Sequence, residues 1–500
     1  MGQPASHAFH HQVWYVALVV HVVTAWFSSG YYAADEHYQV IAFAQHKLGE
    51  LSVEELPWEY DARIRSGFLP GIAYTVIGAS RTWLTANPFH IAFALRLITA
   101  LFALVAVRTF VRAAMVQVSE DLQRPFILLS CFLWFLPYQH VRLAAETWAG
   151  LLFLLGISGF VGASVRNVSW LVAGICFGLC VQMKPAMLVA CGGAMGWALL
   201  RSDTRGRSFI RLLSGGAIAL ALGVAVDSWF YGEPMHTLWN YVYKNSLSIS
   251  KVDPLPVASE TYPWFYYFPW IIKYGIWPIG AVLLAALFWL TYRAPRSLLV
   301  WCIWPYLVLV SAIPHKELRF LFPLMDLIPL MLVLAWHHAG NSRVIRVFEH
   351  RAVLITLIAI NMLGLLVASS TAAGSGRTRL AAILYGNQPL QAGSLGYDLD
   401  DDLLWKARIP PFYLPLGITD IGINDPCAMA NDLPPTPTSD LLIAEEDRCS
   451  SCTPEGLGYR PIGRSETTAG TFLLDLYNSE RPGPYFLYTN ETRTSHPSEP

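Results

Sequence analysis

The chain has 500 residues, of which 54% are hydrophobic, and its mean hydropathy of +0.41 is too high for a single soluble domain. The 34 basic residues balance 35 acidic ones, so the net charge gives no indication of a nucleic-acid or acidic partner. The chain is also too long and too apolar throughout for a single membrane anchor, and its composition therefore predicts a multi-pass membrane protein.

Apolar runs of the length that crosses a bilayer recur along the chain up to residue 370. They lie at 13–30, 90–112, 125–141, 147–165, 168–184, 186–200, 211–229, 264–290, 297–313, 319–337 and 352–370. The N-terminal residues 1–12 contain no Lys or Arg and no convincing cleavage site follows, so we expect the first run to be a retained helix. The fold class expected is an all-α polytopic membrane protein with about 11 transmembrane helices.

The stretch 68–84 differs from these runs because Pro70, Gly71, Gly78 and Arg81 interrupt it. We expect it to be a re-entrant or interfacial segment that does not cross the bilayer. The arginines of the later loops then fall on one side, as is typical of the cytoplasm. That side receives Arg108, Arg112, Arg124, Arg166, Arg201, Arg205, Arg207, Arg211, Arg293, Arg296, Arg343, Arg346 and Arg351.

The opposite side of the membrane, extracytoplasmic or luminal, receives the first external loop at 31–89, the short segments 142–146 and 315–319, and the chain after residue 370. After residue 370 the composition shifts to turn-forming and acidic residues. We expect residues 1–370 to form the transmembrane domain, and residues 371–500 a small extracytoplasmic domain or tail of mixed α and β structure. A disulfide among Cys427, Cys449 and Cys452 is permitted in that compartment, and it would leave one of the three unpaired.

The first external loop combines acids, histidines and aromatic residues. Its acid pair Asp35 and Glu36 precedes the segment HYQVIAFAQHKLG at 37–49, whose apolar residues recur at helical spacing. This pattern predicts an amphipathic helix at the membrane surface. The alternative is a solvated loop in which the acids cap a short helix.

Further ionisable residues fall on the same predicted side. They are Arg142, Glu146, Lys184, His315, Lys316, Glu317 and Arg319. Ionisable residues at membrane level are costly and are usually paired or functional. Carboxylates that face cations suit transfer from a lipid phosphate, because the acid removes a proton from an acceptor hydroxyl while the cations hold the phosphate. Taken singly, 315–319 is also consistent with a polar loop that fixes two helices, and Lys184 with a helix-end lysine that reaches water.

Four segments resemble a known family. They are ADE at 34–36, ELPWEYDARIRSGFLP at 55–70, RLAAE at 142–146 and above all HKELRFLFP at 315–323. In this order they resemble the glycosylphosphatidylinositol and asparagine-glycan α-mannosyltransferases of glycosyltransferase family 22. The chain departs from the family pattern at Ala33 and Ala34, where His-Pro is typical, at 57–60, where Thr-Trp-Glu-Trp is typical, and at Lys184, where Arg is usual.

The resemblance implies a GT-C fold and a membrane glycosyltransferase, most simply a mannosyltransferase. It implies a polyprenyl-phosphate sugar donor of the dolichyl-phosphate-mannose type, a glycan or glycolipid acceptor, and transfer with inversion. The implied location is the bacterial inner membrane or the endoplasmic reticulum membrane, with the active site on the extracytoplasmic or luminal side. A transporter or flippase of lipid-linked sugars is the alternative, although the chain lacks the paired halves that are common in transporters.

The resemblance also implies that an acid of the first loop is the general base, and we assign this role to Asp35. Glu36 then orients Asp35 or the acceptor, because adjacent side chains on a helix point about 100° apart. His315, Lys316, Arg319 and Arg65 are expected to bind the donor phosphate. The acceptor-binding or supporting candidates are Trp58, Glu59, Arg63, Arg142, Glu146, Lys184 and Glu317.

Two alternatives stay open within this loop. Arg63 and Arg65 either clamp the phosphate or pair with Glu59 and Asp61, and Trp58 either stacks on a sugar or anchors the loop at the membrane interface. Because Arg and Lys can hold a single phosphate directly, the expected chemistry requires no metal and no cofactor. The partners expected are the lipid-linked donor, the acceptor and the bilayer, without nucleic acid.

Overall fold

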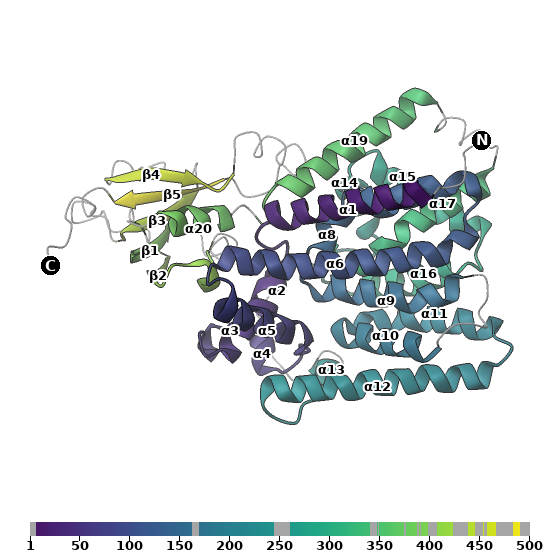
Figure 1. The fold of residues 1–500 in the computed structure, drawn as a ribbon, viewed down its shortest axis with the longest axis horizontal. Coiled ribbons are helices and arrows are strands. Elements are labelled where there is room, and N and C mark those ends of the chain that lie inside the picture. Colours follow the sequence, from purple (N-terminus) through teal and green to yellow (C-terminus); the bar gives the residue numbers. More distant parts are fainter. Residues whose placement is uncertain are drawn as a thin grey trace. The chain divides into compact units, whose positions relative to one another are not determined.

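The structure is a computed structural model, shown in Figure 1. It describes residues 7–162, 170–244, 261–340, 348, 350–374, 377–387, 390, 392–398, 408–423, 439–445, 454, 458–466 and 484–490. The three tail cysteines, and with them the predicted disulfide, lie outside these residues. The chain divides into two compact units, of which the first comprises Met1–Ala25, Ala34–Leu84 and Ala94–Ser369, and the second Trp26–Ala33, Thr85–Phe93 and Ser370–Pro500.

The first unit is helical, as the apolar runs predict. Its α-helices are α1 (His7–Phe27), α2 (Ala34–Glu36), α3 (Ala42–Lys47), α4 (Trp58–Asp61), α5 (Phe68–Trp83), α6 (Pro88–Ala114), α7 (Gln123–Phe132), α8 (Leu136–His140), α9 (Ala145–Val161), α10 (Trp170–Met183), α11 (Leu188–Arg201), α12 (Arg205–Tyr231), α13 (Thr237–Val242), α14 (Tyr267–Tyr274), α15 (Ile279–Arg293), α16 (Leu298–Ala312), α17 (Ile328–Ala339) and α19 (Arg351–Ser370). The last residues of α1, the first residues of α6 and Ser370 of α19 fall in the second unit. A 3-10 segment, η8 (Leu318–Leu327), precedes α17.

Within the described residues, each apolar run of the sequence is largely helical, but four of the runs change geometry along their length, among them 186–200, which begins in the 3-10 segment Pro185–Met187 before α11. The run 125–141 divides into α7 and α8, and the run 264–290 into α14 and α15. The run 319–337 begins as η8 before it continues as α17. Within the described residues, four helices are long and apolar enough to cross a membrane, or five if the bent pair α15 and α16 counts as one span. The number of about 11 spans therefore stays a prediction.

Within the stretch 68–84, residues Phe68–Trp83 form one helix, α5, which continues through Pro70, Gly71 and Gly78. Pro70 lies in the first turn, where a helix needs no backbone N–H from it. Gly71 donates its backbone N–H to Gly67 O at 2.8 Å, which continues the helix past the proline. The helix has 16 residues and is not one of the candidate spans, and its re-entrant or interfacial placement stays a prediction.

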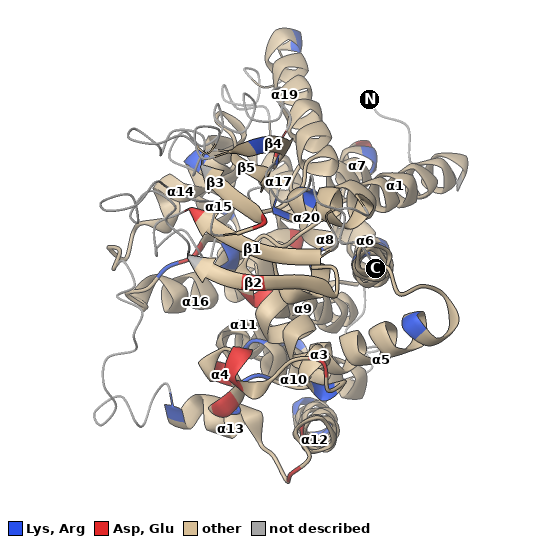
Figure 2. Ribbon diagram, turned by 90° about the vertical axis from the view of Figure 1, so that its left-hand side faces the viewer, with Lys and Arg blue, Asp and Glu red and all other residues tan. Residues whose placement is uncertain are grey.

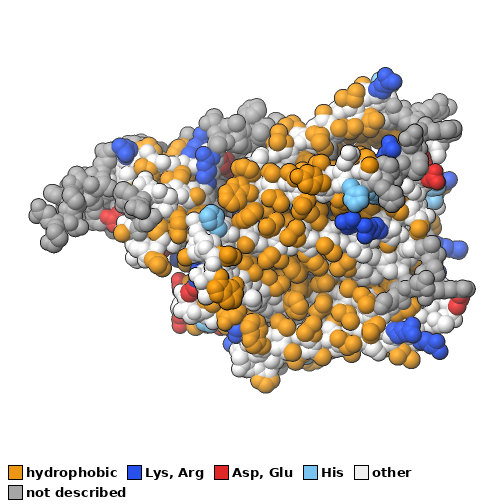
Figure 3. All heavy atoms as spheres, in the orientation of Figure 1, with side chains coloured by type: hydrophobic (Ala, Val, Ile, Leu, Met, Phe, Trp, Pro, Cys, Tyr) orange, Lys and Arg blue, Asp and Glu red, His pale blue; other side chains and the backbone are white. Residues whose placement is uncertain are grey.

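Many large apolar side chains of the first unit are exposed on helix surfaces. On α12, for example, Phe209, Ile210 and Leu213 are about half exposed or more, and Figure 3 shows hydrophobic side chains gathered over the helices, with Lys and Arg toward their right-hand end. Exposed apolar helix surfaces of this extent are expected where lipid is the solvent. The structure is therefore that of a multi-pass membrane protein.

Close helix packing in the first unit depends on glycines at a few positions. Helix α9 lies against η8 at Gly150, where a Cβ would stand 2.8 Å from Pro323 O and 2.9 Å from Pro323 Cα. Such distances leave no room for a side chain. The backbone of η8 is thus fixed directly against the backbone of α9, which matters because η8 also includes Arg319.

The described residues of the second unit form a five-stranded mixed sheet in the order β2-β1-β3-β5-β4. Its strands are β1 (Ala392–Asp398), β2 (Gly417–Ile423), β3 (Leu441–Glu445), β4 (Tyr459–Arg464) and β5 (Tyr485–Asn490). β1 is parallel to both β2 and β3, whereas β5 is antiparallel to β3 and β4. Helix α20 (Arg377–Gly386) contacts the sheet at Ile383, beside Gly463. The assignment of residues 371–500 to a separate extracytoplasmic domain stays a prediction.

Candidate active site

The acid pair lies on a helical stretch that changes geometry immediately after it. α2 ends at Glu36, a π-helical segment continues over His37–Ile41, and α3 begins at Ala42. This confirms the expected helix, although most of its residues are buried and it does not expose a polar face. π-Helical turns occur frequently at functional sites. Asp35 and Glu36 have different partners here, as adjacent positions on a helix require.

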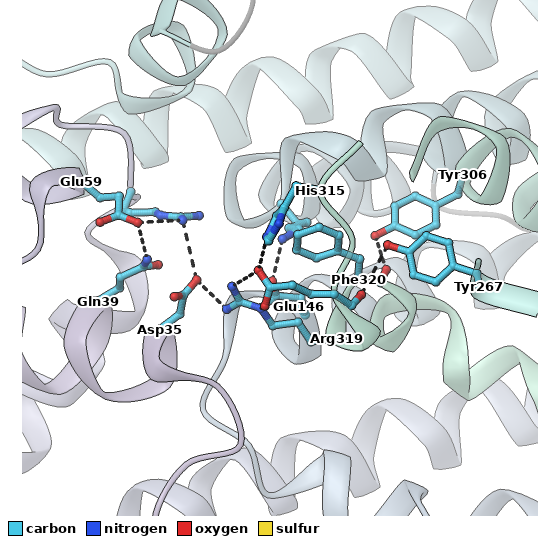
Figure 4. A network of polar contacts seen from close by, with 12 residues as sticks. Asp35, Gln39, Glu59, Glu146, Tyr267, Tyr306, His315, Arg319 and Phe320 are labelled. Atoms are coloured by element: carbon cyan, nitrogen blue, oxygen red, sulfur yellow. Dashed lines mark hydrogen bonds and ion pairs between the residues drawn. The ribbon is translucent and has the colours of Figure 1, made fainter. Parts of the chain in front are cut away.

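Arg319 is at the centre of the charged cluster and has a carboxylate on either side (Figure 4). Its Nη1 lies 2.6 Å from Oδ2 of Asp35, while its Nε and Nη2 donate to Glu317 at 2.6 and 2.8 Å. The side chain of Arg319 is 12% exposed and that of Asp35 is 25% exposed. A guanidinium has enough donors in one plane to hold two carboxylates together. Arg319 therefore joins the HKELR segment to the first loop.

Arg65 extends the cluster on the other side of Asp35. Its Nη2 lies 3.7 Å from Asp35 and 3.5 Å from Glu59, and Gln39 donates to the same Glu59 oxygen at 2.9 Å. Glu59 belongs to α4, a helix marked by its acidic residues in Figure 2. Asp35 thus lies between two arginines, and of the two alternatives for Arg65 the structure contains the pairing with Glu59.

A buried aspartate of α12 fixes the turn that contains Arg65. Asp227 accepts hydrogen bonds from Ser66 Oγ at 2.9 Å, from Gly67 N at 2.7 Å and from the Thr237 hydroxyl. Tyr231 also donates its hydroxyl to Arg65 O at 2.6 Å. Because Asp227 is 2% exposed, these hydrogen bonds form in an environment of low dielectric, where they are strong. The backbone on which Arg65 stands is therefore held to the end of α12.

A second ion pair lies next to Arg319. Lys184 Nζ donates to Glu146 Oε1 at 2.6 Å, and the same ammonium lies 4.5 Å from the ring centre of Phe320. The Lys184 side chain is only 13% exposed. The interpretation of Lys184 as a helix-end lysine that reaches water is wrong, because its charge is directed toward a buried carboxylate.

Glu36 forms an ion pair with Arg142, with 3.8 Å between Glu36 Oε2 and Arg142 Nη1. Arg142 is fully buried, and its guanidinium lies 4.7 Å from the ring centre of Tyr138. A buried arginine is stable only when anions and aromatic faces replace its hydration. The RLAAE segment thus supplies both Arg142, beside Glu36, and Glu146, beside Lys184.

Four of the sequence candidates lie differently. Lys316 donates to the backbone carbonyls of Ser311 and Ile313 at 2.9 and 2.5 Å, so its ammonium caps the end of α16. Arg63 pairs with Glu233 at 3.2 Å instead of Glu59 or Asp61. His315 contacts the cluster through Glu317, with 3.0 Å between His315 Nε2 and Glu317 Oε1. The fourth residue, Trp58, is 42% exposed.

The charge of Glu317 is stabilised by its neighbours. Burial raises the pKa of its carboxyl, but the hydrogen bonds and charge of Arg319, together with His315, outweigh burial and hold that pKa below its ordinary value of 4.5. Glu317 is therefore an anion under neutral conditions. It keeps one edge of the Arg319 guanidinium occupied and directs the other toward Asp35.

A pocket opens beside Asp35. Polar side chains line it through Asp35, Gln39, Arg65, Glu146 and Gln182, and apolar ones through Val40, Phe68, Leu69, Met183 and Pro185, among others. Within the described residues, no three His, Cys, Asp or Glu side chains are grouped as a metal site would require. The pocket thus has carboxylates and a cation that can bind a polar group of a ligand, and these side chains lie beside an apolar wall.

Sequence analysis missed Gln39 and Asp227. It also missed Tyr306 and Tyr267, which donate to the backbone of Phe320 at 2.7 Å and of Glu317 at 3.4 Å. Asp227 had a usable signal, because a lone carboxylate inside an apolar run has to find a partner. The tyrosines had no such signal, because nothing in the sequence distinguishes a tyrosine that donates to a backbone oxygen from the other aromatic residues of a membrane helix.

Comparison with solved structures identifies the fold. The apo crystal structure of ArnT from Cupriavidus metallidurans matches this chain with a TM-score of 0.54 and 13% identity, over 98% of this chain and 99% of ArnT. The structure of the same protein bound to undecaprenyl phosphate matches with a TM-score of 0.53 and 14% identity, over 99% of this chain and all of that one. The fold is thus that of the GT-C class of membrane glycosyltransferases, as expected.

The chain belongs to the Alg9-like mannosyltransferase family, whose family model matches residues 12–383. GPI mannosyltransferase 3 of Drosophila melanogaster is 26% identical over 328 residues, which is 63% of this chain and 54% of that protein. GPI alpha-1,2-mannosyltransferase 3 of Homo sapiens is 23% identical over 305 residues, 59% of this chain and 52% of the human protein. The chain spans about half the length of the curated relatives it matches.

Proposed function

We propose that this protein is an integral-membrane mannosyltransferase that moves mannose from a polyprenyl-phosphate donor to a glycan or glycolipid acceptor with inversion. The observation that supports this best is Asp35, a carboxylate that lies between Arg319 and Arg65 at the edge of a pocket. A base placed next to cations fits a reaction in which a proton leaves the acceptor as a phosphate leaves the sugar. Its membership of a mannosyltransferase family supports the identity of the sugar.

In this mechanism the acceptor hydroxyl gives its proton to Asp35 while its oxygen attacks the anomeric carbon of the mannosyl phosphate. The bond between that carbon and the phosphate oxygen breaks, and the electron pair stays on the polyprenyl phosphate. A single displacement from the face opposite the phosphate inverts the configuration. The products are the mannosylated acceptor, polyprenyl phosphate and a protonated Asp35, which returns its proton to water.

Arg319 is the cation that binds the leaving phosphate. Two of its three nitrogens are committed to Glu317, so the phosphate takes the place of Asp35 at Nη1. This exchange frees the Asp35 carboxylate to accept the acceptor proton at the moment when the donor is in position. Arg65 and Lys184 contribute further positive charge, and Glu36 and Arg142 orient the acceptor side.

The acceptor is a glycolipid of the glycosylphosphatidylinositol type, the type that the names of the two GPI mannosyltransferases indicate for those proteins. The donor lipid belongs to the polyprenyl phosphates, the class that includes the ligand in the second ArnT structure. The reaction needs no metal ion, because the arginine and lysine side chains bind the phosphate directly. Residues 1–370 form the catalytic domain with about 11 spans, and the site faces the extracytoplasmic or luminal side.

The test is a transfer assay with purified protein, polyprenyl-phosphate-[³H]mannose and a panel of glycolipid and glycan acceptors. We expect labelled product, retained in the presence of chelator. Asp35→Asn should lower kcat by about 10² to 10⁴, the usual effect of removing a positioned base. Asp61→Asn, the same exchange at an exposed position of the first loop, is the matched control and should transfer at the wild-type rate.

Two results would contradict the proposal. Near-normal transfer by a folded Asp35→Asn protein would remove the base from Asp35. Movement of the lipid-linked sugar across a vesicle membrane without any new glycosidic bond would instead support the transporter alternative. Loss of transfer on addition of chelator would contradict only the metal-free mechanism.

A further inference from the structure

A continuous chain of buried hydrogen bonds lies outside the residues described so far. His21 of α1, His140 of α8 and Asp326 of η8 are each at most 5% exposed. His140 Nε2 lies 2.8 Å from Asp326 Oδ1, and His140 Nδ1 lies 3.0 Å from His21 Nε2. His21 Nδ1 in turn lies 2.7 Å from Ala17 O. The two rings are nearly parallel, at 17°, with centres 5.2 Å apart.

The number of protons in this chain follows from its geometry. Ala17 O can only accept, so His21 Nδ1 has a proton and its Nε2 is bare unless the ring is charged. If both histidines were neutral and Asp326 ionised, His140 would have one N–H for two neighbours that both accept. Either its contact with His21 or its contact with Asp326 would then join two lone pairs. One additional proton, on His21, His140 or Asp326, satisfies every contact and makes the chain electrically neutral.

The chain also lies where it can act on the candidate site. Asp326 shares η8 with Arg319, and His140 is two residues before Arg142. A parallel contact reinforces this link, because Gln139 Nε2 donates to Phe322 O at 2.8 Å. The two arginines that face Asp35 and Glu36 therefore stand on segments joined to each other by two buried hydrogen bonds. α1 is joined to the same point through His21.

We propose that the His21–His140–Asp326 chain is a neutral, one-proton clamp that positions Arg319 and Arg142 for the transfer reaction. These three residues are positioning residues, and they touch neither donor nor acceptor. The inference rests on the proposed function for its kinetic consequence, whereas its structural consequence is independent of the reaction. Because a misplacement of about 1 Å at a catalytic group can cost about 10²-fold in rate, loss of the clamp should be visible in kcat.

The clamp predicts opposite effects of two substitutions at one residue. In Asp326→Asn the amide N–H donates to His140 Nε2, and His140 Nδ1–H donates to His21, so every contact is kept without the additional proton. In Asp326→Leu, His140 Nε2 loses its partner, and of the two hydrogen bonds that join η8 to α8 only that of Gln139 to Phe322 O remains. Thr291→Val is the control, because it removes a partly buried hydrogen bond from Trp304 between α15 and α16, away from the clamp.

The experiment measures hydrogen–deuterium exchange of peptides covering 136–144 and 318–327 in the purified full-length protein, together with kcat and KM for polyprenyl-phosphate-mannose. Asp326→Leu should increase exchange in both peptides and lower kcat by about 10- to 100-fold with a smaller change in KM. Asp326→Asn and Thr291→Val should resemble the wild type in both peptides and in kcat. His21→Phe, which leaves the Asp326 contact in place, should raise exchange in 136–144 and supplies the same test if Asp326→Leu does not accumulate.

Wild-type exchange in both Asp326→Leu and His21→Phe would overturn the proposal. So would an Asp326→Asn protein as impaired as Asp326→Leu, because the carboxylate charge and not the hydrogen-bond chain would then be what matters. If the wild-type protein transfers no mannose, the proposed function fails, but the exchange comparison still decides whether the clamp exists.

Discussion

The guanidinium of Arg319 performs two tasks that a simple cation cannot combine. It contacts Asp35 from one edge and Glu317 from the other, and both carboxylates come from segments that are far apart in the sequence. An ammonium group has no planar fork and would have to choose between these partners. The position of Asp35, the proposed base, therefore depends on residue 319 being an arginine and not a lysine.

Arg319→Lys should accordingly impair the reaction although the charge is kept. We expect a fall in kcat of about 10² to 10³, the range seen when one donor to a developing charge is lost, and a higher KM for the lipid donor. Steady-state kinetics with polyprenyl-phosphate-mannose measure both values. Arg81→Lys changes an arginine that pairs with Glu50 outside the cluster, and its kinetics should match the wild type. Unchanged kcat in Arg319→Lys would show that charge alone suffices.

The lowered pKa of Glu317 has a consequence for stability at acid pH. A carboxyl whose pKa is lower in the folded protein stabilises it above the ordinary value of 4.5, and this stabilisation disappears as the pH falls through the lowered pKa. The melting temperature of the wild type should thus exceed that of Glu317→Gln at pH 7, and the difference should shrink below about pH 4.5. A difference that stays constant down to pH 3 would contradict the role of its charge.

Much of the charged cluster was predictable at the scale of single residues. Asp35, Glu36, Glu146, Lys184 and Arg319 were all candidates because ionisable side chains at membrane level must find partners. Which carboxylate meets which cation was not predictable, because the pairing depends on contacts between distant segments. Lys316 shows the limit most clearly: its position in the HKELR segment suggested a phosphate ligand, whereas its ammonium caps α16.

At the scale of elements, the position of η8 depends on α9. In Gly150→Ala the new methyl group would stand 2.8 Å from Pro323 O, so the two backbones would have to separate. We expect a loss of stability of about 1 to 3 kcal/mol, typical of overpacking, and a lower kcat because Arg319 shifts with η8. Thermal unfolding followed by tryptophan fluorescence and the transfer assay measure these effects.

Gly192→Ala is the matched control for that substitution. Gly192 lies in α11 and nothing stands within 4 Å of the position that its Cβ would take. An alanine there should leave stability unchanged or raise it by about 0.4 to 1 kcal/mol, because it restricts the unfolded chain. If both substitutions behaved alike, close packing of α9 on η8 would not be the cause of the loss.

The periodicity and length of the apolar runs predicted where helices occur, because burial in lipid requires every backbone group to be paired within its own segment. They did not predict where a helix breaks. The run 125–141 breaks between α7 and α8, and α8 then ends at His140, two residues before Arg142. The 3-10 geometry of η8 spaces its residues differently from an α-helix. Both departures depend on tertiary contacts.

For the molecule as a whole, the predicted sidedness separates the charged cluster from the arginine-rich loops. Single cysteines at Glu54→Cys in the first loop and Thr204→Cys between α11 and α12, in a background without native cysteines, test this with a membrane-impermeant maleimide on sealed vesicles. Following the distribution of Lys and Arg, only Glu54→Cys should react from the extracytoplasmic or luminal side. Labelling of both from the same side would contradict the topology.

The anchoring of the turn at Ser66 and Gly67 by Asp227 separates two parts of the first loop. Arg65 stays in place because its backbone is attached to α12, whatever sequence precedes it. The segment at 57–60, where this chain departs from the pattern typical of glycosyltransferase family 22, precedes that attachment and contacts Arg65 through Glu59, at 3.5 Å. An exposed position of this segment such as Trp58 can therefore change without moving the backbone of Arg65, on which the proposed phosphate contact depends.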